Sequence, residues 1–161
     1  MKHLIRLVLP LFIIALLSAA CPMIDFKESN FTRTKPNKED LIGVYTPNKK
    51  SLQEIRTRGH YPVATHEIIL RSDGTFSIKN MPDWWMNGTG ESGGKLESLD
   101  GRWDLEEAKD IWTIWQISLD TSKARMHVNV YYQRPPYSIF VRVGDPNNGY
   151  AMVFDRTGIS P

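Results

Sequence analysis

Cysteine is almost absent from this chain, which has 161 residues and a single cysteine, Cys21. One cysteine excludes an internal disulfide, a paired-thiol redox centre and the zinc sites built from several thiolates. The folded part of the chain must therefore draw its stability from an ordinary hydrophobic core.

The chain also lacks an excess of charge of one sign. It carries 20 Lys and Arg against 18 Asp and Glu, and removal of Lys2 and Arg6 from the N-terminal segment makes the two counts equal. No block of like charge occurs anywhere in the sequence. Binding to a phosphate backbone requires a basic stripe, so the sequence argues against nucleic acid as a partner.

One uninterrupted apolar run is present, Leu7 to Leu17, close to the N-terminus. It follows a basic start and precedes the small residues Ser18, Ala19 and Ala20. A basic start, an apolar run of about 7–15 residues and a small-residue site describe a secretory signal peptide, which we predict over residues 1–20. An uncleaved anchor is the weaker alternative, because a spanning helix needs about 20 apolar residues.

The sequence Ser18-Ala19-Ala20-Cys21 resembles the lipobox of bacterial lipoproteins, although Ser18 stands where Leu is usual. The resemblance implies a diacylglycerol on the Cys21 thiol and cleavage just before this residue. Two or more acyl chains hold a protein stably on a membrane. The alternative is an ordinary signal peptide followed by a free thiol. Pro22 follows where Asp would signal inner-membrane retention, so in a cell with two membranes we expect the outer one.

Residues 21–38 are predicted to form a flexible tether from the lipidated cysteine. The segment is mostly polar, with scattered apolar residues such as Met23 and Phe31, and has too little apolar content to fold alone. The alternative is an extra edge strand around Ile24 to Phe26.

Residues 39–161 alternate with period two, which is typical of β-strands. The clearest unit is a hairpin with a turn at Ser72-Asp73-Gly74, where Gly74 supplies a positive φ. With Arg71 opposite Thr75, this register pairs Leu70 with Phe76, Ile68 with Ile78, and Glu67 with Lys79. Apolar residues and opposite charges are thus matched together.

Turn signals about every 8–12 residues predict seven or eight short strands in one all-β domain, an antiparallel barrel or sandwich. About 120 residues are enough for a substantial core. Besides the hairpin, strands are expected at 41–46, 101–106, 111–119, 126–133, 137–143 and 150–156.

One short helix is expected between the first two strands. Ser51-Leu52-Gln53-Glu54 is a capping-box pattern with Ser51 as the N-cap. Leu52 and Ile55 would share one side of the helix, and Gly59 would end it.

Three short motifs of the predicted domain resemble those of a known family. Leu41-Ile42-Gly43-Val44-Tyr45, Ser72-Asp73-Gly74-Thr75-Phe76 and Gly101-Arg102-Trp103 are similar to the glycine–tryptophan and Asp-Gly-Thr-Phe motifs of small bacterial lipocalin-like domains. Tyr45 takes the place of the first Trp. The resemblance covers roughly residues 40–119 and implies an antiparallel barrel, with no particular ligand.

Nothing in the sequence predicts catalysis, and no cofactor or metal is expected. Gly90-Glu91-Ser92-Gly93-Gly94 matches the nucleophile-elbow pattern, but its flanks indicate a flexible loop rather than a strand and a helix. The histidines have no metal-ligand spacing. His66 shares the inferred inner face of its strand, which favours a hydrogen-bonded histidine of the core or rim over a metal ligand.

Three tryptophans are the candidate binding residues. Trp84 and Trp85 lie in a long loop that begins at Met81 and continues to Gly101, and long loops are often functional. They either anchor a partner or fold back to plug one end of the barrel, and both can hold if one ring packs and the other protrudes. Trp112 shares with Ile114 the face of its strand opposite Trp115. Either a second layer such as the tether or the long loop covers that face, or Trp112 belongs to an exposed patch.

The sequence therefore predicts a monomeric lipoprotein of the cell envelope, attached to the membrane by lipid on Cys21. Its β-domain is expected to act as a non-catalytic module that binds an envelope protein or glycan. The alternative is a lipocalin-like carrier of a small apolar ligand.

Overall fold

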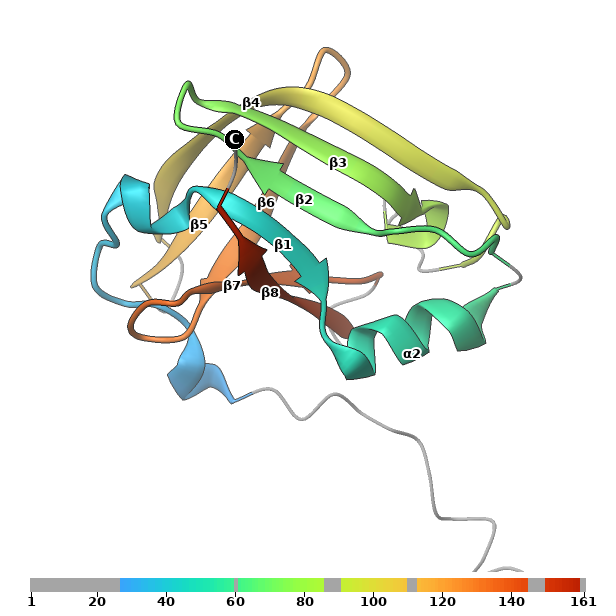
Figure 1. Cartoon of the computed structure of the whole chain (residues 1–161). Coiled ribbons are helices and arrows are strands. Elements are labelled where there is room, and N and C mark those ends of the chain that lie inside the picture. The colour runs from blue at the N-terminus through green and yellow to red at the C-terminus, as the bar shows by residue number, and fades with distance from the viewer. Residues whose placement is uncertain (1–26, 60, 86–90, 110–112, 145–149, 160–161) are drawn as a thin grey trace, which may run out of the picture.

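A computed structural model describes residues 27–59, 61–85, 91–109, 113–144 and 150–159. These residues form a closed barrel of eight antiparallel strands, in which each strand pairs with its neighbours in sequence and β1 pairs with β8 (Figure 1). The prediction of an all-β barrel with one short helix is confirmed. The strands are β1 (Gly43–Pro47), β2 (Glu67–Leu70), β3 (Thr75–Pro82), β4 (Leu96–Lys109), β5 (Thr113–Asp120), β6 (Arg125–Tyr131), β7 (Ser138–Arg142) and β8 (Ala151–Gly158).

The β2–β3 hairpin has the register expected from its sequence. Glu67 lies opposite Lys79, Ile68 opposite Ile78 and Leu70 opposite Phe76. The Lys79 ammonium lies 3.0 Å from the Glu67 carboxylate, and Gly74 takes the positive φ of 79° that the turn requires. The turn and the alternation of apolar residues specify one register, and the barrel uses it.

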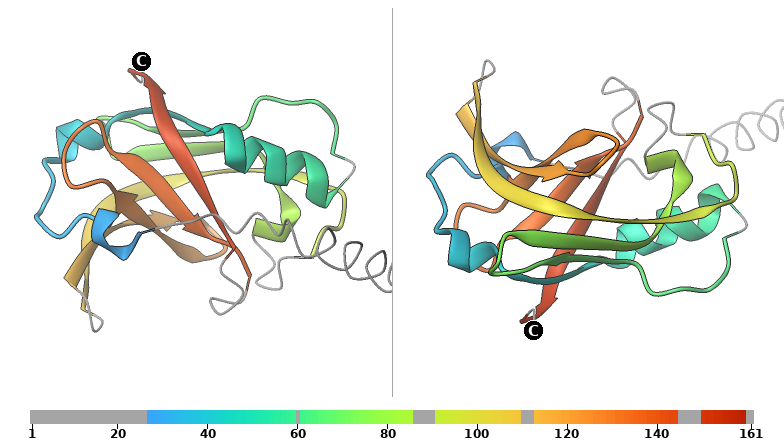
Figure 2. Two further views of the ribbon diagram at one scale, coloured as in Figure 1. Left: turned by 90° about the horizontal axis from the view of Figure 1, so that it is seen from below. Right: turned by 90° about the horizontal axis from the view of Figure 1, so that it is seen from above.

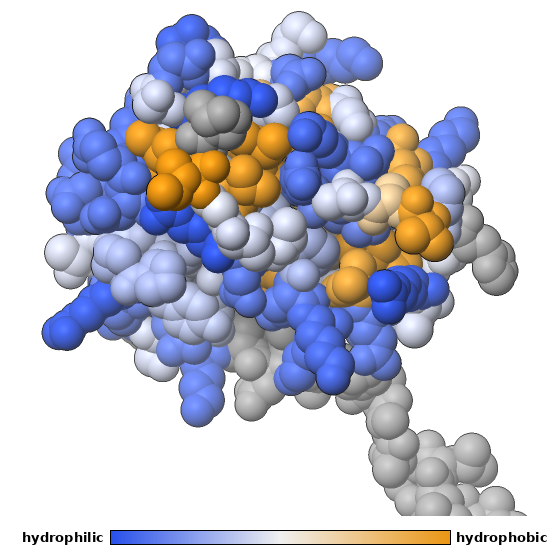
Figure 3. Space-filling view, viewed as in Figure 1, coloured by the Kyte–Doolittle hydropathy of each residue, from blue (hydrophilic) through white to orange (hydrophobic). Residues whose placement is uncertain are grey.

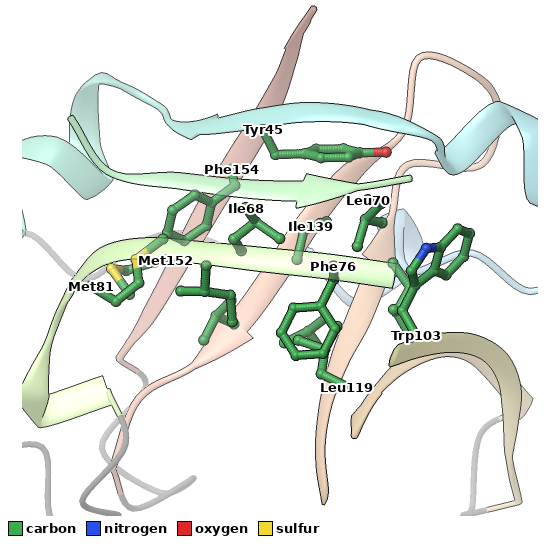
Figure 4. Close-up of a cluster of buried hydrophobic side chains, with 14 of the residues drawn as sticks. Tyr45, Ile68, Leu70, Phe76, Met81, Trp103, Leu119, Ile139, Met152 and Phe154 are labelled. Carbon is green, nitrogen blue, oxygen red and sulfur yellow. The ribbon is translucent and has the colours of Figure 1, made fainter. Parts of the chain in front are cut away.

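Side chains fill the interior of the barrel (Figure 4). Small barrels of about eight strands are just wide enough to be packed in this way. Tyr45 crosses the interior from β1, and its hydroxyl donates a hydrogen bond of 2.7 Å to the carbonyl of Leu41. Burial raises the pKa of this hydroxyl well above its ordinary value. The fully buried core residues include Tyr45, Ile68, Leu70, Phe76, Ile78, Met81, Trp84, Ile117, Leu119, Val130, Ile139, Met152 and Phe154.

Gly101 and Trp103 of the glycine–tryptophan motif have separate structural roles. A Cβ on Gly101 would lie 2.0 Å from the carbonyl oxygen of Asp120, so β4 and β5 approach too closely there for any side chain. The Trp103 indole is buried and donates 2.9 Å to the carbonyl of Arg71, and the ammonium of Lys38 lies 4.7 Å from its ring centroid. The motif therefore closes the end of the barrel at the β2–β3 turn.

The helix α2 (Lys49–Arg58) lies against β8 and the end of β1 (Figures 1 and 2). Its N-cap is Asn48, whose side chain accepts from the Ser51 amide at 2.9 Å. The assignment of Ser51 as the cap was therefore wrong. Ser51 is fully buried inside the helix, and its hydroxyl accepts 2.8 Å from the Val153 amide of β8. Ile55 packs into the core and Gly59 ends the helix, as expected.

The described part of the predicted tether, residues 27–38, differs from a flexible segment. A turn of 3-10 helix, η1 (Glu28–Asn30), leads into Phe31, which is 4% exposed. Thr32 then lies between two strands: its amide donates to the Val130 carbonyl of β6, and its carbonyl accepts from the Trp115 amide of β5. A second turn of 3-10 helix, η2 (Lys38–Leu41), leads into β1. Residues 27–38 are therefore part of the domain and are called the N-terminal strap below.

The strap covers apolar side chains on the outside of the barrel. Phe31 stacks edge-on against Tyr131 and Phe140, with ring centroids 5.5 and 4.9 Å apart. Ile114, from the outer face of β5, belongs to the same cluster, together with Ala151 and Val153. A second layer thus covers the outer side of this strand at Ile114, which is one of the two alternatives expected for that face. Trp112 lies outside the described residues.

Candidate functional site

The adjacent tryptophans lie at the α2 end of the barrel, in a turn of 3-10 helix, η3 (Asp83–Trp85), that follows β3. Trp84 is 1% exposed and belongs to the main core. Trp85 is half-buried, packs against the same core, and lies 6.4 Å from the ring of Phe154. The structure therefore favours the alternative in which these residues close the barrel, most clearly for Trp84.

Arg58 at the end of α2 covers Trp84. Its guanidinium lies 5.6 Å from the Trp84 ring and 3.8 Å from the Tyr150 ring, and it pairs with Glu54 at 3.1 Å. The cavity beside Trp84 measures only about 10 Å³, roughly the volume that one water requires. The indole Nε1 has no hydrogen-bond partner among the described residues. Trp84 is thus held by packing and a cation–π contact.

The loop before β4 is shorter than the sequence suggested, because β3 extends to Pro82 and β4 begins at Leu96. Asp83 joins the two ends of this loop. Its carboxylate accepts from the Tyr61 hydroxyl at 2.8 Å and from the amides of Gly93 and Lys95 at 3.2 Å. Partial desolvation raises the pKa of Asp83, but these hydrogen bonds outweigh it and leave that pKa below its ordinary value.

Tyr61 connects the loop after α2 to the loop before β4. Its hydroxyl lies 2.8 Å from Asp83 and 2.6 Å from the Ser92 hydroxyl. Desolvation is the main cause that raises the pKa of Tyr61 to about 12, so the phenol remains protonated at neutral pH. Ser92 stands in an exposed loop before strand β4, whereas a nucleophile elbow needs a helix after the serine.

His66 lies just before β2 and is 5% exposed. Its Nδ1 donates to the carbonyl of Asn80 at 2.5 Å, which confirms the prediction of a hydrogen-bonded histidine at the core or rim. Asn80 has a φ of 53° at an irregularity in the β3–β4 pairing. Its side chain donates 2.9 Å to the carbonyl of Thr65. Asn tolerates this left-handed conformation better than most residues, and strained backbone of this kind often occurs at functional sites.

A cleft of about 320 Å³ opens between α2 and the segment that leads into β2. We call it the α2 cleft. In the space-filling view of Figure 3, apolar surface lies on this side of the molecule, right of centre. Sequence reasoning missed the cleft, although Pro62-Val63-Ala64, an apolar stretch in a connecting segment, was a usable signal. Its lining residues are Leu52, Ile55, Arg56, Gly59, Tyr61, Pro62, Val63, Ala64 and His66.

A second pocket, of about 480 Å³, lies at the opposite end of β2 beside the β2–β3 turn. Charged residues dominate its lining, and most are paired with one another. Arg125 contacts Asp120 at 2.5 Å and Glu106 at 3.4 Å, and Lys38 contacts Asp104 at 3.0 Å. These ion pairs lower the pKa values of Asp104 and Asp120. With three cationic and four anionic residues, the pocket is nearly balanced in charge and offers no strong attraction to either sign of ligand.

The described part of the chain holds no group of three or more His, Cys, Asp or Glu side chains arranged to bind a metal ion. It also contains no helix with the length and apolar character to cross a bilayer. Cys21 lies outside the described residues. No known protein family, curated protein or solved structure matches this chain.

Proposed function

We propose that this protein is a lipid-anchored lipoprotein of the cell envelope whose barrel acts as a non-catalytic binding module. The anchor is supported by the sequence: a basic start, the apolar run Leu7 to Leu17, and Ser18-Ala19-Ala20-Cys21. Acyl chains on Cys21 hold the protein to the membrane, and in a cell with two membranes this is the outer one.

The packed interior of the barrel is the observation that best supports the proposal of a binding module. Side chains from β1, β2, β3, β5 and β8 meet at the centre, among them Tyr45, Phe76 and Phe154 (Figure 4). A carrier of apolar molecules needs an interior that side chains leave open, as in larger or emptier barrels. The packing favours binding at the outside of the barrel, to an envelope protein or glycan, over carriage of a ligand within it.

The short segment between Cys21 and the start of the strap limits how far the barrel can lie from the membrane. Ser29 is already joined to the barrel, because its carbonyl accepts 2.8 Å from the Gln133 side chain. Seven residues separate Cys21 from Ser29, and the two residues can therefore lie at most about 29 Å apart when the chain is fully extended. The lipoprotein therefore presents its binding surface close to the membrane.

The test is expression of the full chain in a bacterial host beside Cys21→Ala. The wild-type protein is expected in the membrane fraction, to be released by detergent and to carry acyl chains. Cys21→Ala is expected to lose the lipid and to stay unprocessed at this site. Cys21→Ser, which has nearly the size of the wild-type residue but no thiol, is the matched control and should behave like Cys21→Ala. Equal membrane attachment and processing of all three chains would contradict the proposal.

A further inference from the structure

We propose that the α2 cleft binds an N-acylated apolar amino acid with a free carboxylate, the chemistry that the carboxy-terminal residue of a peptide also presents. The inference rests on the proposed function, since it names the ligand of the binding module. Three parts of the cleft each match one part of this ligand: an apolar wall, a hydrogen-bond acceptor and a cation.

The wall of the cleft suits an aliphatic side chain. Leu52 and Ile55 line it from α2, and Pro62, Val63 and Ala64 line it from the facing segment. Val63 is fully exposed at the rim, where it would be covered by a bound ligand. The volume of about 320 Å³ is at the lower end of the range for small-molecule sites, and it matches one amino-acid residue better than a large ligand.

His66 supplies the acceptor. A carbonyl oxygen can only accept, so the bond to Asn80 places a hydrogen on Nδ1. Nε2 of the neutral imidazole is then an acceptor, and it has no hydrogen bond among the described residues. Among the described residues, Trp84 Nε1 is the one fully buried side-chain nitrogen or oxygen without a hydrogen-bond partner. Because Nε2 of His66 also has no partner, it cannot be fully buried and keeps some contact with solvent. His66 lines the cleft, and we infer that Nε2 meets solvent there, where an amide N–H of the ligand can donate to it.

Arg56 supplies the cation. It lies in the last turn of α2, is exposed, lines the cleft, and has no ion-pair partner among the residues that the structure describes. This differs from Arg58 two residues later, which is paired with Glu54. A guanidinium is suited to a carboxylate because it can donate two parallel hydrogen bonds. The cleft thus has a charge that its surroundings leave available.

The experiment is an NMR titration of the chain from Pro22 to Pro161, which contains every described contact of the fold. N-acetyl-leucine is expected to shift the signals of Leu52, Ile55, Val63 and Ala64 and to saturate. N-acetyl-leucinamide, which lacks the carboxylate, should bind about tenfold more weakly, the effect of one charge-assisted hydrogen bond. The acetoxy analogue, which has oxygen in place of the N–H, should bind about fivefold more weakly. N-acetyl-glycine should bind at least about tenfold more weakly, because it has no side chain to bury.

Arg56→Gln is the deciding variant, because the residue is exposed and its replacement leaves the fold intact. It should remove the preference for N-acetyl-leucine over its amide. Arg102→Gln, which removes an exposed arginine at the opposite end of β2, is the matched control and should keep that preference. A tetrapeptide ending in Leu separates the two sources of the ligand: tighter binding identifies a peptide terminus, and equal binding identifies a free acylated amino acid.

Shifts that do not saturate, equal affinity for the acid and the amide, or an unchanged preference in Arg56→Gln would overturn the proposal. The chain used has no anchor, so these results are independent of the test on Cys21. Failure here would leave the membrane attachment standing, and failure of attachment would leave the binding result standing.

Discussion

Trp84 and Trp85 show how two adjacent residues of one type take different roles. The Trp84 ring is enclosed by the core and by Arg58, whereas the Trp85 ring is only half-buried. Sequence reasoning could place both in one loop at the end of a barrel. It could not separate them, because a turn of 3-10 helix has no apolar period long enough to show which side faces inward.

Trp84→Ala is expected to lower the free energy of unfolding by about 3–5 kcal/mol, the usual cost of removing a buried aromatic side chain. Trp85→Ala should cost only about 1–2 kcal/mol, because less apolar area is removed from the interior. Urea titration monitored by circular dichroism measures both values. A small loss for Trp84→Ala would contradict its role as the residue that closes the barrel.

Tyr61→Phe is expected to lower stability at neutral pH by about 1 kcal/mol, because Asp83 loses a hydrogen bond. The pKa of Asp83 is depressed in the folded state. Its contribution is therefore full above the unfolded-state pKa, about 4, and is lost as the pH falls through the lower folded-state value. The difference between the two proteins should thus shrink below about pH 4. Urea titrations at several pH values measure it.

Tyr150→Phe is the matched control for that experiment. Its hydroxyl has no hydrogen bond among the described residues, so its removal should leave the pH dependence unchanged. A difference between wild type and Tyr61→Phe that stays constant down to pH 3 would show that Tyr61 does not act through Asp83.

At the scale of elements, the β2–β3 hairpin and the strap mark the limits of what local sequence can predict. The hairpin was predictable to the residue, because its turn and its alternation specify the same register. The strap was not, because its contacts with Val130 and Trp115 join residues about 80–100 positions apart and its own composition resembles a linker. The predicted start of α2 was misplaced for a similar reason. Ser51 fits the sequence pattern of an N-cap, but its hydroxyl accepts a hydrogen bond from the Val153 amide of the distant strand β8.

The α2 cleft was missed on the same ground. Its apolar wall comes from two segments, of which only Pro62-Val63-Ala64 carries a signal in the sequence, and only the fold brings Val63 and Leu52 to the same cleft. Of its residues, sequence reasoning singled out His66, the pair Leu52 and Ile55, and Gly59. It assigned them to structure and had no means of recognising that they face a common space.

Phe31→Ala is expected to lower the free energy of unfolding by about 3 kcal/mol, because the ring is buried against Tyr131 and Phe140. A chain that begins at residue 39 should be less stable still, because the Val130 carbonyl and the Trp115 amide lose their partners. Ile159→Ala, at an exposed position, is the control and should change stability by less than about 0.5 kcal/mol. Equal stability of the chains starting at 22 and 39 would show that the strap is only a tether.

At the scale of the whole molecule, the barrel is filled by its own side chains, and the proposed lipid anchor at Cys21 would lie a short distance away. The filled interior favours binding at the outside of the barrel, and the proposed anchor would hold that outer surface near the membrane. The two are independent, because the anchor follows from residues 1–21 and the packing follows from residues 27–159. A single observation of the intact mature protein can examine both.

That observation is the mass of the detergent-solubilised protein, measured first under native and then under denaturing conditions. We predict a chain that starts at Cys21 and carries covalent diacylglycerol, with or without a further acyl chain on its amine, and the same mass under both conditions after detergent is removed. A chain that starts elsewhere with a free thiol would contradict the anchor. An apolar molecule retained only under native conditions would contradict the filled barrel.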